Sequence, residues 1–144
     1  MRYLLALSLV SLLSCSAYKK QQASAQAKTA AAISLAGTSW VLESIPDFTL
    51  EQTRKPVTLL FGTDNHISGN GGCNRYGGDY TQSGDSLSIG HLLSTKMACT
   101  PGMETESHLM YALQEANRAT VTGGKLELRK DSTLLASFTP GPKD

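Results

Sequence analysis

Apolar and polar residues alternate with a period of two over most of the chain after residue 37, which is typical of strands with one buried face. In the first such segment, Trp40 and Leu42 would point to one side, and Val41 and Glu43 to the other. Residue types that favour turns, such as glycine, asparagine and aspartate, separate the segments. The pattern predicts short strands at 37–45, 56–62, 66–69, 80–82, 86–89, 120–122, 125–129 and 134–138.

One segment, from 103 to about 118, has helical spacing instead. Thr100 and Pro101 precede it, which suits a side-chain cap followed by proline at the first helical position. We expect Leu109, Met110, Leu113 and either Ala116 or Asn117 on the buried side, and Glu104, Glu106, Gln114 and Arg118 in water. Because turns connect most strands, the sequence predicts an α+β fold: a small curved antiparallel β-sheet or partly open barrel of about seven strands, with one packed α-helix.

The stretch 69–80 interrupts the alternation, since five of its twelve residues are glycine. Such a cluster indicates positive φ angles, a bulge, or backbone that approaches another group closely. We interpret the stretch as a tightly bent crossing between two strands, with Cys73 at its buried centre. Its polar and aromatic residues form a candidate surface for a ligand or partner: Asn70, Asn74, Arg75, Tyr76 and Tyr80.

The N-terminus has the pattern of an export signal. Arg2 gives it a positive start, and residues 4–13 are almost wholly apolar, a run too short to span a membrane as a helix. Residues 12–15, Leu-Leu-Ser-Cys, resemble a bacterial lipobox, which implies cleavage before the cysteine and attachment of a diacylglycerol and an acyl chain. The sequence therefore predicts a lipoprotein signal peptide at 1–14 and lipidation at Cys15.

The domain boundaries follow from composition. Residues 15–35 are rich in alanine, glutamine and lysine, which predicts a flexible tether, followed by one folded domain at 36–139 and a tail at 140–144. Ser16 follows the lipobox cysteine, and by analogy with enteric sorting this favours the outer membrane, with the domain facing the periplasm. The predicted partners are the membrane, through the lipid anchor, and an envelope protein or small ligand.

Cys73 and Cys99 are open to three interpretations: a disulfide, a metal pair, or a nucleophile with a bystander. Export past an oxidising compartment favours the disulfide. Zinc would need two further ligands, but His66, His91 and His108 lie singly, without paired spacing. A nucleophile would need a free thiol and a positioned histidine. We therefore expect a disulfide, with no metal, no cofactor and no catalytic residue.

The charge balance bears on possible partners. Lys plus Arg number 13 and Asp plus Glu number 12, so the formal net charge is +1. Binding to nucleic acid normally requires a clustered basic face, and the sequence has no run of like charge. The glycine-rich stretch also lacks the Gly-Lys-Ser/Thr of a phosphate-binding loop. The sequence thus predicts no nucleic-acid partner.

Three segments together resemble the META domain family, whose bacterial members include the HslJ-like lipoproteins. They are Thr-Ser-Trp at 38–40, Gly-Asn-Gly-Gly-Cys-Asn at 69–74 with Tyr76 and Tyr80, and Thr-Lys-Met-Ala-Cys at 95–99 followed by Glu106. The resemblance extends over 36–138 and implies a small α+β domain on an envelope lipoprotein or secreted protein. It implies no catalytic residues.

Members of the family are associated with heat shock, stress and drug tolerance, or virulence. The resemblance therefore implies a non-enzymatic envelope lipoprotein that acts in stress response or drug tolerance by binding a protein or small ligand. The alternative is an envelope hydrolase that uses a histidine and a carboxylate in an unrecognised active site.

Overall fold

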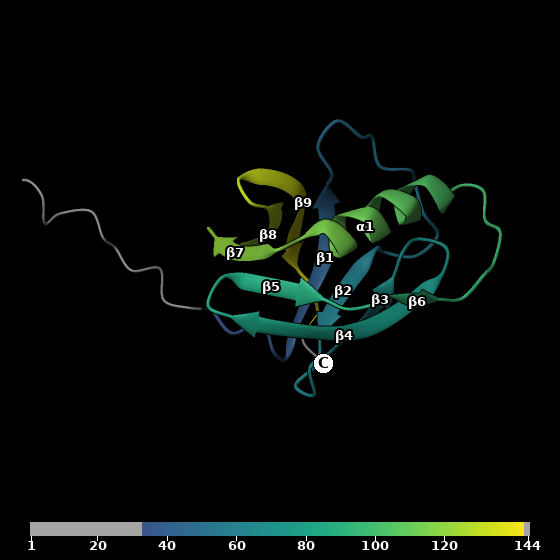
Figure 1. Cartoon of the computed structure of the whole chain (residues 1–144). Coiled ribbons are helices and arrows are strands. Elements are labelled where there is room, and N and C mark those ends of the chain that lie inside the picture. The colour runs from purple at the N-terminus through teal and green to yellow at the C-terminus, as the bar shows by residue number, and fades with distance from the viewer. Residues whose placement is uncertain (1–32, 143–144) are drawn as a thin grey trace, which may run out of the picture. The chain divides into compact units, whose positions relative to one another are not determined.

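The computed structural model describes residues 33–142. This part of the chain forms nine strands and one helix (Figure 1). In chain order they are β1 (Thr38–Ser44), β2 (Thr58–Phe61), β3 (His66–Asn70), β4 (Arg75–Ser83), β5 (Ser86–Ile89), β6 (Leu93–Ser94), α1 (Met103–Glu115), β7 (Arg118–Thr122), β8 (Lys125–Lys130) and β9 (Thr133–Pro140).

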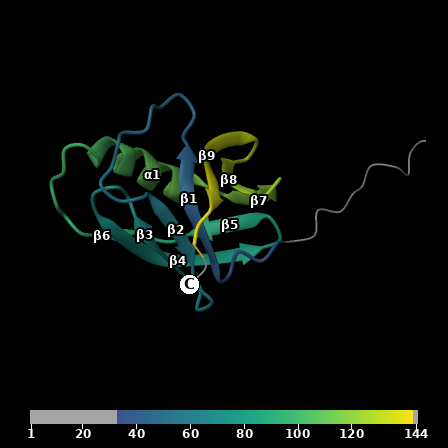
Figure 2. The ribbon, with the colours of Figure 1, turned by 180° about the vertical axis from the view of Figure 1, so that it is seen from behind.

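All strand pairs are antiparallel and belong to one sheet. The sheet order is β3-β2-β1-β9-β8-β7-β5-β4-β6, and a further pairing of β3 with β4 closes the series into a ring. Helix α1 contacts β8 and β9, and it lies on the far side of the domain from β1 when the molecule is viewed from behind (Figure 2). The predicted combination of a curved antiparallel sheet and one helix is therefore confirmed.

The predicted count of about seven strands is too low. The two-residue strand β6 was not expected, because so short a segment has no readable alternation. The glycine-rich stretch, predicted to be only a bend, also contains the start of β4, which runs through Gly77 and Gly78. Glycine has a low strand propensity, but here each of these glycines pairs with a residue of β3, which fixes the extended backbone.

The core lies inside the ring and is built by the alternating residues of the strands. Leu59, Phe61 and Ile67 are fully buried, and Trp40 is buried as predicted. The rings of Phe61 and Tyr80 meet edge to face, with centroids 5.0 Å apart. Apolar residues of α1 complete the core from the other side, so the buried faces of α1 and of every strand except the exposed β6 join one cluster.

The packed chain begins earlier than the boundary predicted at residue 36. Leu35, assigned by the sequence to the tether, is 1% exposed and belongs to the core. Gln82 holds this segment, since its Oε1 accepts the Leu35 amide at 2.9 Å and its Nε2 donates to the Ile33 carbonyl at 2.6 Å. A single leucine after a run of alanines has no periodicity that would reveal its burial. The predicted signal peptide, Cys15 and the rest of the tether lie outside the described residues.

Candidate functional site

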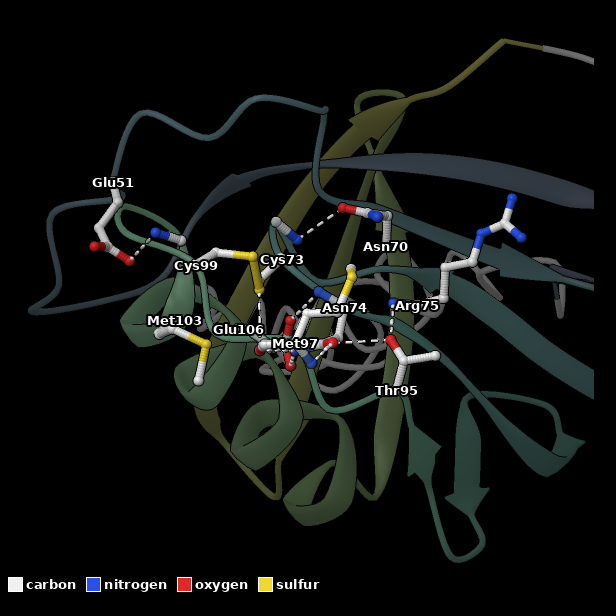
Figure 3. Close-up of a disulfide and its surroundings, with 12 residues drawn as sticks. Glu51, Asn70, Cys73, Asn74, Arg75, Thr95, Met97, Cys99, Met103 and Glu106 are labelled. Carbon is white, nitrogen blue, oxygen red and sulfur yellow. Dashed lines mark hydrogen bonds between the residues drawn. A yellow bond between two sulfur atoms is a disulfide. The ribbon is translucent and has the colours of Figure 1, made fainter.

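Cys73 and Cys99 are joined by a disulfide, with their Cα atoms 5.7 Å apart. Cys73 lies in the bend between β3 and β4, and Cys99 lies in residues 95–101, which connect β6 to α1. We call residues 95–101 the strap. Figure 3 shows the disulfide where the strap crosses the bend, beside the start of α1. Of the three interpretations of these cysteines, the structure therefore agrees with the disulfide.

The strap has almost no buried surface of its own. Its residues are exposed except for Cys99, which is half-buried. Even the large apolar side chain of Met97 is 55% exposed. Apolar burial therefore contributes little to holding this segment, because the hydrophobic contribution scales with the area removed from water. Its position must depend on the disulfide and on polar contacts.

Asn74 supplies those polar contacts. Its Oδ1 accepts the Met97 amide at 2.7 Å and the Thr95 hydroxyl at 2.8 Å. Its Nδ2 donates to the Met97 carbonyl at 3.2 Å and to Glu106 Oε1 at 2.9 Å. A carboxamide has two donors and two acceptor lone pairs, so Asn74 uses all four. Asn74 is 2% exposed, and its side chain bonds to both the amide and the carbonyl of Met97.

Glu106 holds Asn74 in turn. This carboxylate, from the first turn of α1, accepts the Asn74 backbone amide at 2.5 Å through Oε2 in addition to the side-chain bond through Oε1. Glu106 is 8% exposed, and a buried carboxylate is tolerated only when donors satisfy its oxygens. One asparagine thus links α1 to the strap. We call Asn74, Thr95, Met97 and Glu106 the polar hub.

Two glycines leave room for the side chains of Glu106 and Tyr76. A Cβ atom at Gly71 would lie 2.6 Å from Cγ of Glu106, and one at Gly69 would lie 2.6 Å from the hydroxyl of Tyr76. Tyr76 is paired opposite Gly69 and donates its hydroxyl to the Thr58 carbonyl at 2.8 Å. Burial raises the pKa of Tyr76, so it stays a neutral donor. Gly69 and Gly71 therefore allow close approach, which is one of the three alternatives that the sequence left open.

Helix α1 is capped by a residue distant in sequence. The predicted cap at Thr100 is wrong: the helix is preceded by Gly102, which provides no side-chain bond. Glu51 caps it instead, because its Oε2 accepts the amides of Gly102, Glu104 and Thr105 at 3.0, 3.0 and 3.1 Å. These bonds, the Thr105 amide first among them, lower the pKa of Glu51. The Glu51 amide in turn bonds to the Thr105 hydroxyl at 3.0 Å.

The candidate surface predicted from the glycine-rich stretch is only partly a surface. Asn74, Tyr76 and Tyr80 are buried, although Tyr76 still contributes to the wall of one groove. The two tyrosines lie on the inward face of β4, where alternation places them once Gly77 and Gly78 belong to the strand. Asn70 is half-buried and Arg75 is exposed, and both line one shallow groove with Thr58 and Ser68.

The sequence also missed two residues of this region. Glu106 was expected in water because of its charge, yet its spacing from Leu109 and Leu113 puts it on the buried stripe of α1. Glu51 lies in an irregular connection 53 positions from Glu104, and nothing local in the sequence indicates that it caps a helix.

The described residues hold no group of three or more His, Cys, Asp or Glu side chains that could bind a metal ion. The histidines have other surroundings: His66 Nδ1 lies 2.6 Å from Asp79 Oδ1, the ring of His108 stacks on Phe48, and His91 is exposed. Every buried side-chain nitrogen and oxygen in residues 33–142 has a hydrogen-bond partner. The buried side-chain atoms of the polar hub thus all have hydrogen-bond partners within the domain.

These features define a class of protein: a small antiparallel β-domain with one helix, in which a disulfide and a saturated polar hub secure the connection to the helix. The META domain model matches residues 33–140, so the chain belongs to the META domain family. No curated protein matches the chain. The family assignment agrees with the resemblance carried by the three sequence segments.

Solved structures share the fold. An NMR structure of a protein from Burkholderia xenovorans is 34% identical, with a TM-score of 0.61, over 74% of this chain and 83% of that one. A second NMR structure is 27% identical, with a TM-score of 0.58, over 72% and 90%. A crystal structure of a DUF4847 family protein from Bacteroides vulgatus is 13% identical, with a TM-score of 0.56, over 76% and 96%, and shows the fold alone.

We predict that loss of the disulfide lowers stability strongly. The two cysteines are separated by 26 positions, for which the chain-entropy model gives about 3.5 kcal/mol. The variant Cys73→Ser/Cys99→Ser should lose up to that amount in the free energy of unfolding, measured by urea titration. The parent protein should take up no alkylating agent at these positions without reductant. Two adducts by intact mass would contradict the disulfide.

A second prediction concerns pH. Because the pKa of folded Glu51 lies below its ordinary value of 4.5, the cap stabilises the domain above that pH and is lost as pH falls through the lower, folded pKa. Glu51→Gln should therefore lower the melting temperature by several degrees at pH 7, and the gap should close in acid. Glu104→Gln, in the helical turn that Glu51 caps, is the matched control and should have a smaller effect. If the difference in melting temperature between the parent and Glu51→Gln is as large at pH 3 as at pH 7, this account is contradicted.

Proposed function

We propose that this protein is a lipid-anchored protein of the bacterial cell envelope whose META domain is a non-enzymatic binding module. The supporting observation is the disulfide between Cys73 and Cys99. Disulfides persist in oxidising compartments and are rare in the cytosol. The disulfide and the apolar N-terminal run together favour export to the periplasmic side.

The anchor in this proposal is Cys15. The lipobox-like residues 12–15 place the cysteine directly after the apolar run, where signal cleavage and acylation occur. Two or three acyl chains, palmitate among them, hold a protein firmly, since each buried methylene contributes roughly 0.8 kcal/mol. Ser16 after the cysteine favours the outer membrane. No helix in residues 33–142 is long and apolar enough to cross a membrane.

A binding role fits how the domain uses its polar groups. The buried polar side chains at the bend and at α1 are occupied by hydrogen bonds that hold the chain together. Groups that are already saturated do not act on a substrate without breaking those bonds. We propose that the outward-facing side chains meet an envelope protein or a small ligand. By its family resemblance, the protein would act in stress response, including heat shock, or in drug tolerance.

The second candidate is an envelope hydrolase, and one observation favours it. His66 and Asp79 lie 2.6 Å apart, which is the pairing that orients a histidine base. Both side chains are exposed, however, and no nucleophilic side chain bonds to His66 within the described residues. Turnover of a generic ester, peptide or glycan substrate that is abolished by His66→Gln would favour this candidate over the binding module.

The anchor gives a direct prediction. Cells that produce the parent protein and are fed radiolabelled palmitate should incorporate the label, and the protein should fractionate with the outer membrane. Cys15→Ala should abolish the labelling and release or misprocess the protein, whereas the neighbouring Ser16→Ala should still be labelled. Equal labelling of Cys15→Ala and the parent would contradict the lipid anchor.

A further inference from the structure

The cations of the domain are divided into two groups. Residues 33–142 contain eight Lys and Arg residues. Arg118, Lys125, Arg129 and Lys130 each pair with a carboxylate. The other four, which form no ion pair with a described residue, are Arg54, Lys55, Arg75 and Lys96.

These four cations belong to the bend between β3 and β4 or to segments that contact it. Lys55 and Arg75 line the same groove. The connection that carries Arg54 and Lys55 touches the bend, because a Cβ at Gly72 would lie 2.7 Å from the Thr53 methyl group. Lys96 follows Thr95, whose backbone and hydroxyl pair with the Arg75 backbone. One end of the domain therefore presents unpaired positive charge, which attracts an anion.

The floor of this groove is the outer face of β1 to β4, and its side chains form an ordered array. Register places Thr58, Asn70 and Arg75 in one row across three strands. Ser39, Leu60 and Ser68 form the adjacent row. Opposed side chains in such a row are about 5 Å apart, and successive rows on one face are about 7 Å apart. Three strands make each row about 10 Å long, so the array has room for one sugar unit with its hydroxyl groups.

The chemistry of the array is that of hydroxyl recognition beside a charge. Ser39 and Ser68 offer hydroxyl groups, and Asn70 offers its Nδ2 donors, since its Oδ1 accepts the Gly72 amide at 2.9 Å. Leu60 gives an apolar contact between them. Figure 3 shows the Arg75 guanidinium directed away from the polar hub, so it takes no part in the hydrogen bonds of the hub. A guanidinium matches a carboxylate or phosphate through paired hydrogen bonds.

We propose that this groove, called here the array groove, binds an acidic sugar: a carbohydrate unit that carries a carboxylate or a phosphate. Arg75 and Lys55 bind the anionic group, and Ser39, Ser68 and Asn70 bind ring hydroxyls. The proposal deepens the proposed binding function by naming the ligand class, and it does not depend on the lipid anchor at Cys15.

The test uses the full chain with Cys15→Ser, and titrates it with glucuronate, glucose 6-phosphate, glucose and inorganic phosphate while amide chemical shifts are recorded. The acidic sugars should bind and shift the amides of Ser68, Asn70 and Arg75. Preference for glucuronate or for glucose 6-phosphate separates carboxylate from phosphate ligands. Glucose should bind more weakly for lack of charge, and phosphate more weakly for lack of hydroxyls.

Lys55→Gln/Arg75→Gln should weaken binding of the acidic sugars by at least about tenfold, because a hydrogen bond to a charged group contributes about that factor. Both side chains are exposed, so the melting temperature should not change. Lys125→Gln, which removes a paired lysine on another strand, is the matched control and should leave binding unchanged.

Four results would overturn the proposal: no binding of either acidic sugar, glucose binding as tightly as glucuronate, phosphate binding as tightly as glucose 6-phosphate, or equal loss in Lys125→Gln. None of these results would affect the palmitate labelling that tests the anchor, so the two proposals fail separately.

Discussion

The carboxamide of Asn74 forms hydrogen bonds with three residues of two segments, the strap and α1. It bonds to both backbone groups of Met97, to the Thr95 hydroxyl and to Glu106 of α1. The strap has little apolar burial to hold it, so its path depends on this side chain and on the disulfide two residues further along. A buried amide that lost these partners would be left with unsatisfied donors and acceptors, which costs about 1–3 kcal/mol for each group.

The arrangement explains several otherwise unrelated residues. Glu106 must be on the buried side of α1 to receive Asn74, and position 71 must be glycine because Glu106 fills the space of a side chain. Glu51 then fixes the beginning of the same helix from a different connection. The cap and the hub both act on the first turn of α1, and the disulfide holds the strap that leads into that turn. This end of the domain adjoins the array groove on the outer face of β1 to β4.

Local patterns were sufficient to predict much of the fold but not its polar contacts. Alternation at Trp40 and Leu42 predicted β1 and its buried face. The two cysteines that follow the predicted export signal indicated their pairing. Tyr76 and Tyr80 were misplaced because glycines hid the strand that contains them. Glu51 could not have been predicted, since its partners lie more than fifty positions away and helix capping is ordinarily read from adjacent residues.

The candidate site also combines residues that the sequence identified with residues that only the structure brings together. The sequence identified the glycine-rich stretch and Arg75, because unusual composition is visible without a structure. It could not identify the outer array, because Ser39, Thr58 and Ser68 become neighbours only through strand register. Isolated serines and threonines in a sequence carry no signal of their own. Pairing across β1, β2 and β3 brings them to one face.

The central claim is that Asn74 holds the strap, and amide hydrogen exchange of Met97 tests it most directly. In the parent protein the Met97 amide, although its residue is exposed, should be protected far beyond an unstructured peptide, because it donates to Asn74 Oδ1. In Asn74→Ala, Met97 should lose most of that protection while Leu128, in the core of β8, keeps more of its own. An unprotected Met97 amide in the parent, or equal protection in the variant, would contradict the claim.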